Sequence, residues 1–275
     1  MHEQQQSTTP ENVRYELLRP EEIISARDRI PVAYVPLGPL EWHGPHLPIG
    51  VDMLHAYSLA LEAARRTGGV VLPALPLGSE TVLESDRVRD RGFDGQEKIV
   101  GMDFPGLSLP SLYIEDSAFG VIVHEIIRAL KRQRFKVIVL VNGHGGKFHL
   151  ITLDRIVAEE TESGIVTILH AFHLDPGENK GGHAEKWETG LMMALYGNTV
   201  DINLLPPLPE PLKSRDFGIL DLPTCFGQPT DDYSVRKNQD PRLASEEEGQ
   251  ESFVKEVEKL AQIVRRALLD FNKTA

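Results

Sequence analysis

The chain contains a single cysteine, few basic residues and no long hydrophobic run, and each shortage excludes a class of protein. Cys225 is the only cysteine in 275 residues, so no disulfide can form within the chain and a reducing compartment is expected. The 29 Lys and Arg residues are outnumbered by 41 Asp and Glu residues, which gives a formal charge of −12. Nucleic-acid binding relies on Lys and Arg at phosphates, so we expect no nucleic-acid partner.

The hydrophobic residues are dispersed along the chain. No apolar run approaches the roughly 20 residues that a helix needs to span a bilayer. Nothing near the N-terminus resembles a signal peptide, in which a charged segment precedes an apolar one. We therefore expect no membrane partner and a cytoplasmic location.

Short apolar runs alternate with helical patterns, which is typical of a mostly parallel sheet covered by helices on both faces. The apolar runs predict strands at about 31–35, 70–75, 137–141 and 165–170. Helical patterns are found at about 20–26, 53–66, 116–134, 148–162, 185–195 and 245–271. The predicted fold class is α/β.

Two segments depart from this alternation. Residues 1–12 are polar and aperiodic, which predicts a disordered tail ahead of a single domain over residues 13–275. Residues 78–102 are charged and weakly periodic, and we interpret them as an insertion. Long loops in compact domains are usually functional or disordered. The insertion is therefore either a solvated surface segment or a loop that covers or completes a site.

The first candidate site segment, 36–52 (PLGPLEWHGPHLPIGVD), follows the first predicted strand. Glu41 and His43 are two residues apart, so in an extended backbone both side chains leave on the same face. Asp52 lies where the next helix begins, a position that Asp favours as a cap. The two carboxylates and the imidazole could hold a divalent metal, or they could be ordinary turn and cap residues.

Two further segments carry candidate residues. His144 lies in Asn-Gly-His-Gly-Gly, directly after another predicted strand. The carboxyl ends of parallel strands form one crevice, so His144 should face the Glu41 segment. In the third segment, which begins at His183, Glu185 and Glu188 would share one face of a helix. That segment could equally be a surface helix with a Glu-rich face.

The three segments resemble the signatures of the creatininase family, and Phe104-Pro105-Gly106 and Asp240-Pro241-Arg242 match recurrent stretches of that family. The resemblance runs from about residue 32 to residue 249. It implies a three-layer α/β/α sandwich around a mostly parallel sheet, and a homohexameric assembly. It also implies a metal-dependent hydrolase of the amidohydrolase type.

Carried over by position, the resemblance makes Glu41, His43, Asp52 and His144 metal ligands, with Asp52 bridging two ions. Glu41 and His144 would complete one site, and His43 would help to form the other. The family enzyme creatininase has a further Glu ligand two residues after the motif His, where this chain has Gly146. Glu188 is our candidate for that missing ligand.

The catalytic residues are expected in the third segment. His183 would be the acid–base residue, since imidazole titrates near neutral pH, and Glu185 could orient it. Mixed imidazole and carboxylate ligands suit Zn²⁺, which we favour, with Mn²⁺ or Fe²⁺ as alternatives, at one or two ions per subunit.

We predict that the enzyme opens a small cyclic substrate at a C–N (cyclic amide) bond by means of a metal-activated water. The insertion and the Gly-Met-Asp-Phe-Pro run at 101–105 resemble family members that open oxidised inositol rings. That resemblance implies an alternative, a ring-opening C–C hydrolase that acts on an oxidised cyclitol such as 3-dehydro-scyllo-inosose. Two other readings stay open. One is a mononuclear Fe²⁺ oxygenase using His43, Asp52 and His144, and the other is a non-catalytic site that binds metal or a small ligand.

Overall fold

The computed structural model describes residues 12–89, 93–107, 109–161, 167–171, 174, 182–212, 214–215, 218–219 and 238–274. The predicted tail therefore lies outside the described residues, apart from Asn12. The centre of the fold is a four-stranded sheet in the order β2-β1-β3-β4, and every pair of neighbours in it is parallel. Its strands are β1 (Val32–Leu37), β2 (Val70–Val71), β3 (Val137–Asn142) and β4 (Thr167–Ala171). The predicted parallel sheet is confirmed.

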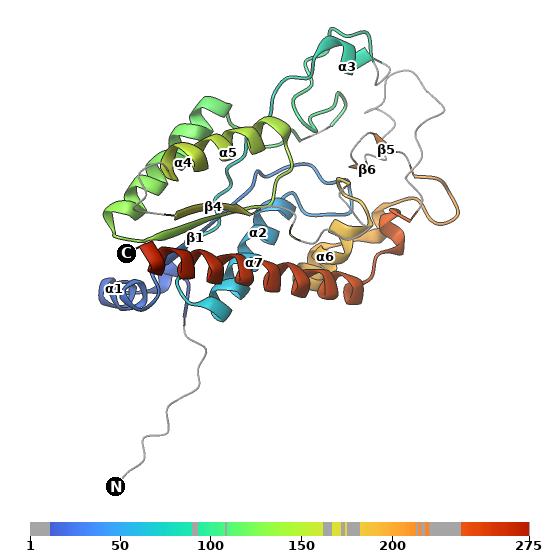
Figure 1. Cartoon of the computed structure of the whole chain (residues 1–275). Helices are drawn as coiled ribbons and strands as arrows, with labels where there is room; N and C mark the ends of the chain where they lie inside the picture. The colour runs from blue at the N-terminus through green and yellow to red at the C-terminus, as the bar shows by residue number, and fades with distance from the viewer. Residues whose placement is uncertain are drawn as a thin grey trace.

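Helices cover both faces of this sheet (Figure 1). One face packs on α2 (Val51–Thr67), α6 (Lys186–Tyr196) and α7 (Glu246–Thr274). The other packs on α4 (Asp116–Arg132), α5 (Lys147–Thr161) and the N-terminal α1 (Pro20–Arg29). Successive residues of β1 alternate between the two cores, and all six of them are buried. The three-layer sandwich is confirmed. A strand covered on both faces has to be apolar throughout, which explains the continuous apolar run of β1.

The boundaries differ from the predictions mainly in the second strand. The apolar pattern predicts a strand over 70–75, but β2 ends at Val71. Beyond it the Leu72 N–H donates to the Tyr34 carbonyl at 2.9 Å, and an isolated bridge joins Leu75 to Leu37. Pro73 cannot donate to a strand neighbour, which explains the early end. The predicted start of the last helix is confirmed, since the Glu248 N–H donates to Ser245 Oγ at 3.2 Å.

The ends of β1 and β3 lie side by side and touch the start of α2. Leu37 pairs with Asn142, and the Gly143 N–H donates to the Leu37 carbonyl at 3.0 Å. A Cβ on Gly143 would lie 2.0 Å from the Asp52 carbonyl oxygen, and one on Gly38 would lie 2.7 Å from Asp52 Cβ. Glycine is needed at both positions because the backbone of α2 fills the space.

The insertion forms a small apolar cluster of its own. It contains α3 (Ser85–Arg89), which lies away from the sheet in Figure 1. Val88 and Ile99 are buried there, and Trp42 of the first site segment packs against the same cluster. A segment that covers Trp42 is more than a solvated surface, which favours the interpretation that it helps to form a site.

Helices α6 and α7 cross with their backbones in contact. A Cβ on Gly249 would lie 1.9 Å from the Gly190 carbonyl oxygen. Helix α7 is also joined to α2 by a buried ion pair between His55 Nε2 and Glu256 Oε2, 2.7 Å apart. None of the helices within the described ranges is long and apolar enough to cross a membrane.

The Gly249 contact can be tested by substitution. We expect Gly249→Ala to lower the free energy of unfolding by about 1–3 kcal/mol, because the added methyl group forces the two helices apart. Thermal or urea unfolding would measure the change. Gly197→Ala is the matched control, since a Cβ there meets nothing within 4 Å. Equal stabilities for the two variants would contradict the close crossing.

Candidate metal centre

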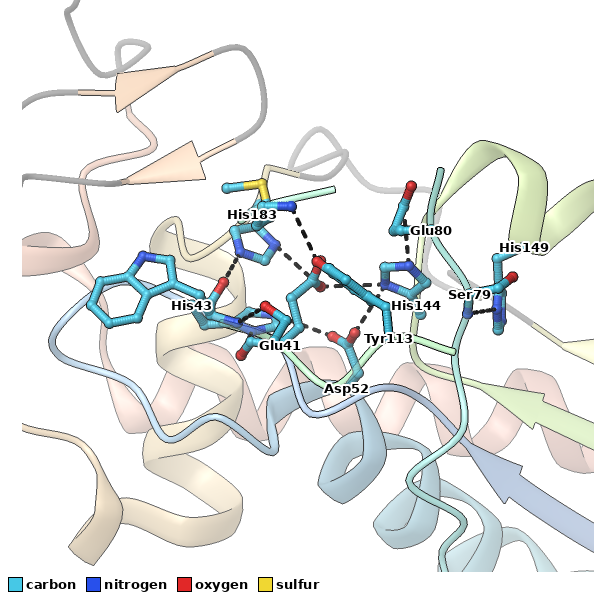
Figure 2. Close-up of polar contacts among 12 residues, drawn as sticks. Glu41, His43, Asp52, Ser79, Glu80, Tyr113, His144, His149 and His183 are labelled. Carbon is cyan, nitrogen blue, oxygen red and sulfur yellow. Dashed lines mark hydrogen bonds and ion pairs between the residues drawn. The ribbon is translucent and has the colours of Figure 1, made fainter. Parts of the chain in front are cut away.

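The side chains predicted as metal ligands converge at the carboxyl edge of the sheet, and Figure 2 labels Glu41, His43, Asp52 and His144 among them. They come from the loop after β1, the first turn of α2, the loop after β3 and the first turn of α6. None of them is more than 9% exposed to solvent. They are Glu41, His43, Asp52, His144 and Glu188.

The ligand atoms form two groups that share Asp52. His144 Nδ1 lies 3.1 Å from Asp52 Oδ2 and 3.3 Å from Glu41 Oε2. His43 Nε2 lies 3.1 Å from Asp52 Oδ1 and 3.9 Å from Glu188 Oε2. Within each group the ligand atoms lie within 4.8 Å of one another. The two oxygens of Asp52 thus face different groups, which is the arrangement that a bridging carboxylate requires.

Asp52 does not act as a helix cap. The residue at the N-cap position of α2 is Gly50, and Asp52 lies inside the first turn. Its carboxylate contacts His43 and His144. The capping interpretation of Asp52 is therefore wrong, because its side chain points away from the helix end towards the two imidazoles.

The orientation of His43 leaves one nitrogen free for a metal. Its Nδ1–H donates to the Glu41 carbonyl oxygen at 3.0 Å, since a carbonyl can only accept. Nε2 is buried and has no partner in hydrogen-bonding geometry, although Asp52 Oδ1 is near. A buried nitrogen beside a carboxylate, with no bond of its own, fits a divalent cation placed between them.

The charges of the site also fit a cation. In the described part of the chain no Lys or Arg pairs with Glu41, Asp52 or Glu188. Burial alone would lower the pKa of His43, but Asp52 and Glu188 outweigh it and raise the pKa to about 10. Burial opposes the same effect in His144, yet Glu41 and Asp52 raise the pKa of that ring well above its ordinary value. Without metal, the carboxylates therefore favour the protonated form of both rings.

The remaining carboxylates respond to the same surroundings. Burial would raise the pKa of Asp52, but the positive rings of His43 and His144 hold that pKa below its ordinary value. Burial raises the pKa of Glu188 to about 7, and His43 only partly offsets it. The Ala184 N–H donates to Glu188 Oε2, which fixes the carboxylate. Of these two carboxylates, Glu188 is thus the one that keeps a proton more readily.

His183 lies beside these groups as a neutral base. Its Nε2–H donates to the Trp42 carbonyl oxygen, which leaves a lone pair on Nδ1, 3.7 Å from Glu41 Oε2. Burial and the positive charge of His43, whose ring centroid is 4.0 Å away, lower the pKa of His183 to about 4. His183 also forms a third candidate ligand group, with Glu41 and His43. His183 is therefore able to accept a proton at the site or to bind metal.

Glu185 is buried at the N-cap position of α6. The hydrogen bond that orients His183 runs to the Trp42 carbonyl, and the ion-pair contact of His183 runs to Glu41. Among the described contacts, the Trp42 carbonyl therefore orients His183, which is the role that we predicted for Glu185. A catalytic role for Glu185 stays a prediction.

Two further side chains reach the centre that the sequence analysis did not identify. The Tyr113 hydroxyl donates to Glu41 Oε1 and accepts the Met102 N–H at 3.1 Å. Burial and Glu41 raise the pKa of Tyr113, so its hydroxyl remains a donor. Glu80 Oε1 lies 3.2 Å from His144 Nε2. Neither residue belongs to a periodic pattern or a motif. The only sequence feature related to Glu80 is Gly146, whose missing side chain leaves space for the Glu80 carboxylate beside His144.

Comparisons with known proteins agree on one family. The sequence model described as creatininase, creatinine amidohydrolase, matches residues 16–264. A creatinine amidohydrolase of Pseudomonas putida is 29% identical over 191 residues, which are 62% of this chain and 67% of that protein.

Solved structures of creatininase resemble this chain in fold. A manganese creatininase has a TM-score of 0.67 at 22% identity, and a mutant creatininase of Zn–Zn type has 0.66 at 23%. Each alignment covers 93% of this chain and 98% of the other.

The raised pKa values predict that metal binding releases protons. At pH 8 His43, with a pKa of about 10, is protonated and Glu188, with a pKa of about 7, is mostly ionised, and the raised pKa of His144 favours its protonated form as well. Each imidazole must lose a proton to bind metal, so we expect about two protons released when both sites fill. The affinity should therefore fall as the pH falls below about 10, the pKa of His43.

Calorimetric titration with Zn²⁺ in buffers of different ionisation enthalpy would count these protons. His43→Gln should release about one proton fewer, because it removes one of the two imidazolium groups. Binding of Zn²⁺ without proton release at pH 8 would contradict the charge states described above.

Proposed function

The chain belongs to the creatininase family of amidohydrolases, and from that membership we propose that it is a metal-dependent hydrolase of a small cyclic amide. The observation that carries the proposal is the pair of ligand groups that share Asp52. A site of this form suits two ions with one bridging carboxylate. Glu41 and His144 would complete one ion's ligands, and His43 and Glu188 the other's.

The choice of metal follows from the donor atoms. Imidazole nitrogens and carboxylate oxygens suit Zn²⁺ and Mn²⁺, and no cysteine lies among the described ligand groups. The related creatininase structures include a Zn–Zn form and a manganese form. These facts support Zn²⁺ or Mn²⁺ as the cofactor.

When bound, the ions supply Lewis acidity, which lowers the pKa of a water from 15.7 towards about 7 and polarises a carbonyl. His183 then moves the proton. Its neutral Nδ1 accepts a proton from the attacking water as the oxygen bonds to the carbonyl carbon. The C–N bond breaks, and the same proton passes from Nδ1 to the departing nitrogen.

The other side chains of the site hold this geometry. The Trp42 carbonyl keeps the His183 proton on Nε2, so that Nδ1 is the atom that accepts. The Tyr113 hydroxyl donates to Glu41 and restrains that carboxylate. Glu41, His43, Asp52 and His144 are buried away from bulk water, which strengthens the electrostatic interactions between the site and a developing oxyanion.

The small cyclic amide is supported by the name of the matching relative, a creatinine amidohydrolase. A panel of cyclic amides, including creatinine, tests this proposal directly when oxidised cyclitols are assayed beside it. Ring opening of a cyclitol without any amide hydrolysis would replace the proposal with the C–C alternative. The predicted homohexamer and cytoplasmic location stay predictions.

Removal of the bridge is the most direct test of the mechanism. We expect Asp52→Asn to lower kcat/KM by more than about 100-fold, the upper end of the loss for residues that only support ligands. Elemental analysis should show fewer ions per chain. Asp154→Asn is the control, since that side chain is 76% exposed. Full activity with two ions in Asp52→Asn would rule out the bridge.

A further inference from the structure

Glu80 lies against the ring of His144 on the side away from the shared carboxylate. His144 Nδ1 faces Asp52 and Glu41, and its Nε2 lies 3.2 Å from Glu80 Oε1 (Figure 2). The ring is therefore held between carboxylates at both nitrogens. Glu80 comes from the insertion, whereas the groups on the other side come from the sheet edge and α2.

The backbone before Glu80 is fixed to the core. The Ser79 N–H donates to His149 Nδ1 at 3.3 Å, and the Ser79 hydroxyl donates to Asp116 Oδ1 at 2.9 Å. Asp116 accepts a second hydroxyl from Thr152 at 2.9 Å. Ser79 and His149 are fully buried. The position of Glu80 is thus set by α4 and α5 and not by a free loop.

His149 also fixes the backbone of His144. Because His149 Nδ1 accepts the Ser79 N–H, the ring proton is on Nε2, which donates to Asn142 Oδ1 at 2.9 Å. Asn142 Oδ1 also accepts the His144 N–H at 3.0 Å, and Asn142 Nδ2 donates to the His144 carbonyl at 2.6 Å. His149 therefore fixes Glu80 and His144 relative to each other.

Gly146 leaves room for this contact. A Cβ at residue 146 would lie 2.2 Å from Glu80 Oε1 and 2.5 Å from His144 Nε2. Gly146 is not among the glycines with positive φ, so its backbone does not require glycine. Space for the carboxylate and the ring is what the glycine provides.

We propose that Glu80 is a positioning residue of the metal centre that accepts the Nε2–H of His144 and turns Nδ1 towards Asp52 and Glu41. The proposal rests on the metal centre of the proposed function. A carboxylate on the second nitrogen of a metal-binding histidine fixes the ring's tautomer and orientation and raises the basicity of the ligand atom. Without Glu80, no side chain among the described contacts would hold the proton on His144 Nε2.

Metal affinity of the full chain tests the proposal. Zn²⁺ binding is measured at pH 8 by competition with a chromophoric chelator, for wild type, Glu80→Gln and Glu80→Ala. We expect Glu80→Ala to bind Zn²⁺ about 10–100-fold more weakly, and Glu80→Gln to lie between it and wild type, because the amide oxygen still accepts a hydrogen bond. Glu84→Gln is the matched control, an exposed Glu of the same insertion.

Two further readouts separate positioning from general stability. The melting temperature of the metal-free variants should stay close to that of wild type, since a lower value would assign Glu80 a structural role. In the zinc-loaded protein, the ¹⁵N resonance of the His144 Nε2–H should shift in Glu80→Gln and stay unchanged in Glu84→Gln.

Gly146→Ala provides an independent variant. Its methyl group should displace Glu80 and the His144 ring and thereby weaken Zn²⁺ binding. Adding Glu80→Ala to this variant should then weaken Zn²⁺ binding less than Glu80→Ala does in the wild-type chain. Wild-type affinity in Glu80→Ala would overturn the positioning role while leaving the proposed function intact. Failure of wild type itself to bind Zn²⁺ would overturn both.

Discussion

The contact of α2 with the ends of β1 and β3 is the constraint on which the rest of the site depends. Gly38 and Gly143 have no side chains, so the first turn of the helix lies directly on the strand ends. That contact puts the Asp52 carboxylate between His43 and His144. Two strand ends and one helix start thus set the separation of the proposed ligands before any metal is present, and a preorganised site of this kind needs little rearrangement to bind.

Buried charge is the second constraint. Carboxylates taken out of water are unstable unless a positive partner is near, and protonated imidazoles are the partners that the described structure supplies. Protons and divalent cations therefore compete for one set of lone pairs. The excess of buried negative charge is costly in the metal-free protein. A cation-binding hydrolytic centre needs that same excess of negative charge.

Much of this was predictable from the sequence. Apolar runs gave the parallel strands, and Glu41, His43 and His144 were expected together because each follows a strand of one sheet. Glu188 was reached through a family resemblance and a helical segment. Glu80 and Tyr113 were not predicted, because tertiary hydrogen bonds from Ser79 to His149 and from Tyr113 to Glu41 place them. Such contacts join segments far apart in the chain and leave no periodic pattern.

The insertion packs on its own cluster of Val88, Ile99 and their neighbours, while Trp42 and Glu80 connect it to the ligands. The insertion and the ligand-bearing strand ends are therefore under different constraints during evolution. The strand ends that carry the ligands are closely packed and tolerate little change, whereas a segment with a separate core can vary in length and sequence. New substrate preferences can therefore arise in residues 81–102, beyond the fixed Ser79 and Glu80, while the hydrolytic chemistry at the sheet edge is inherited unchanged.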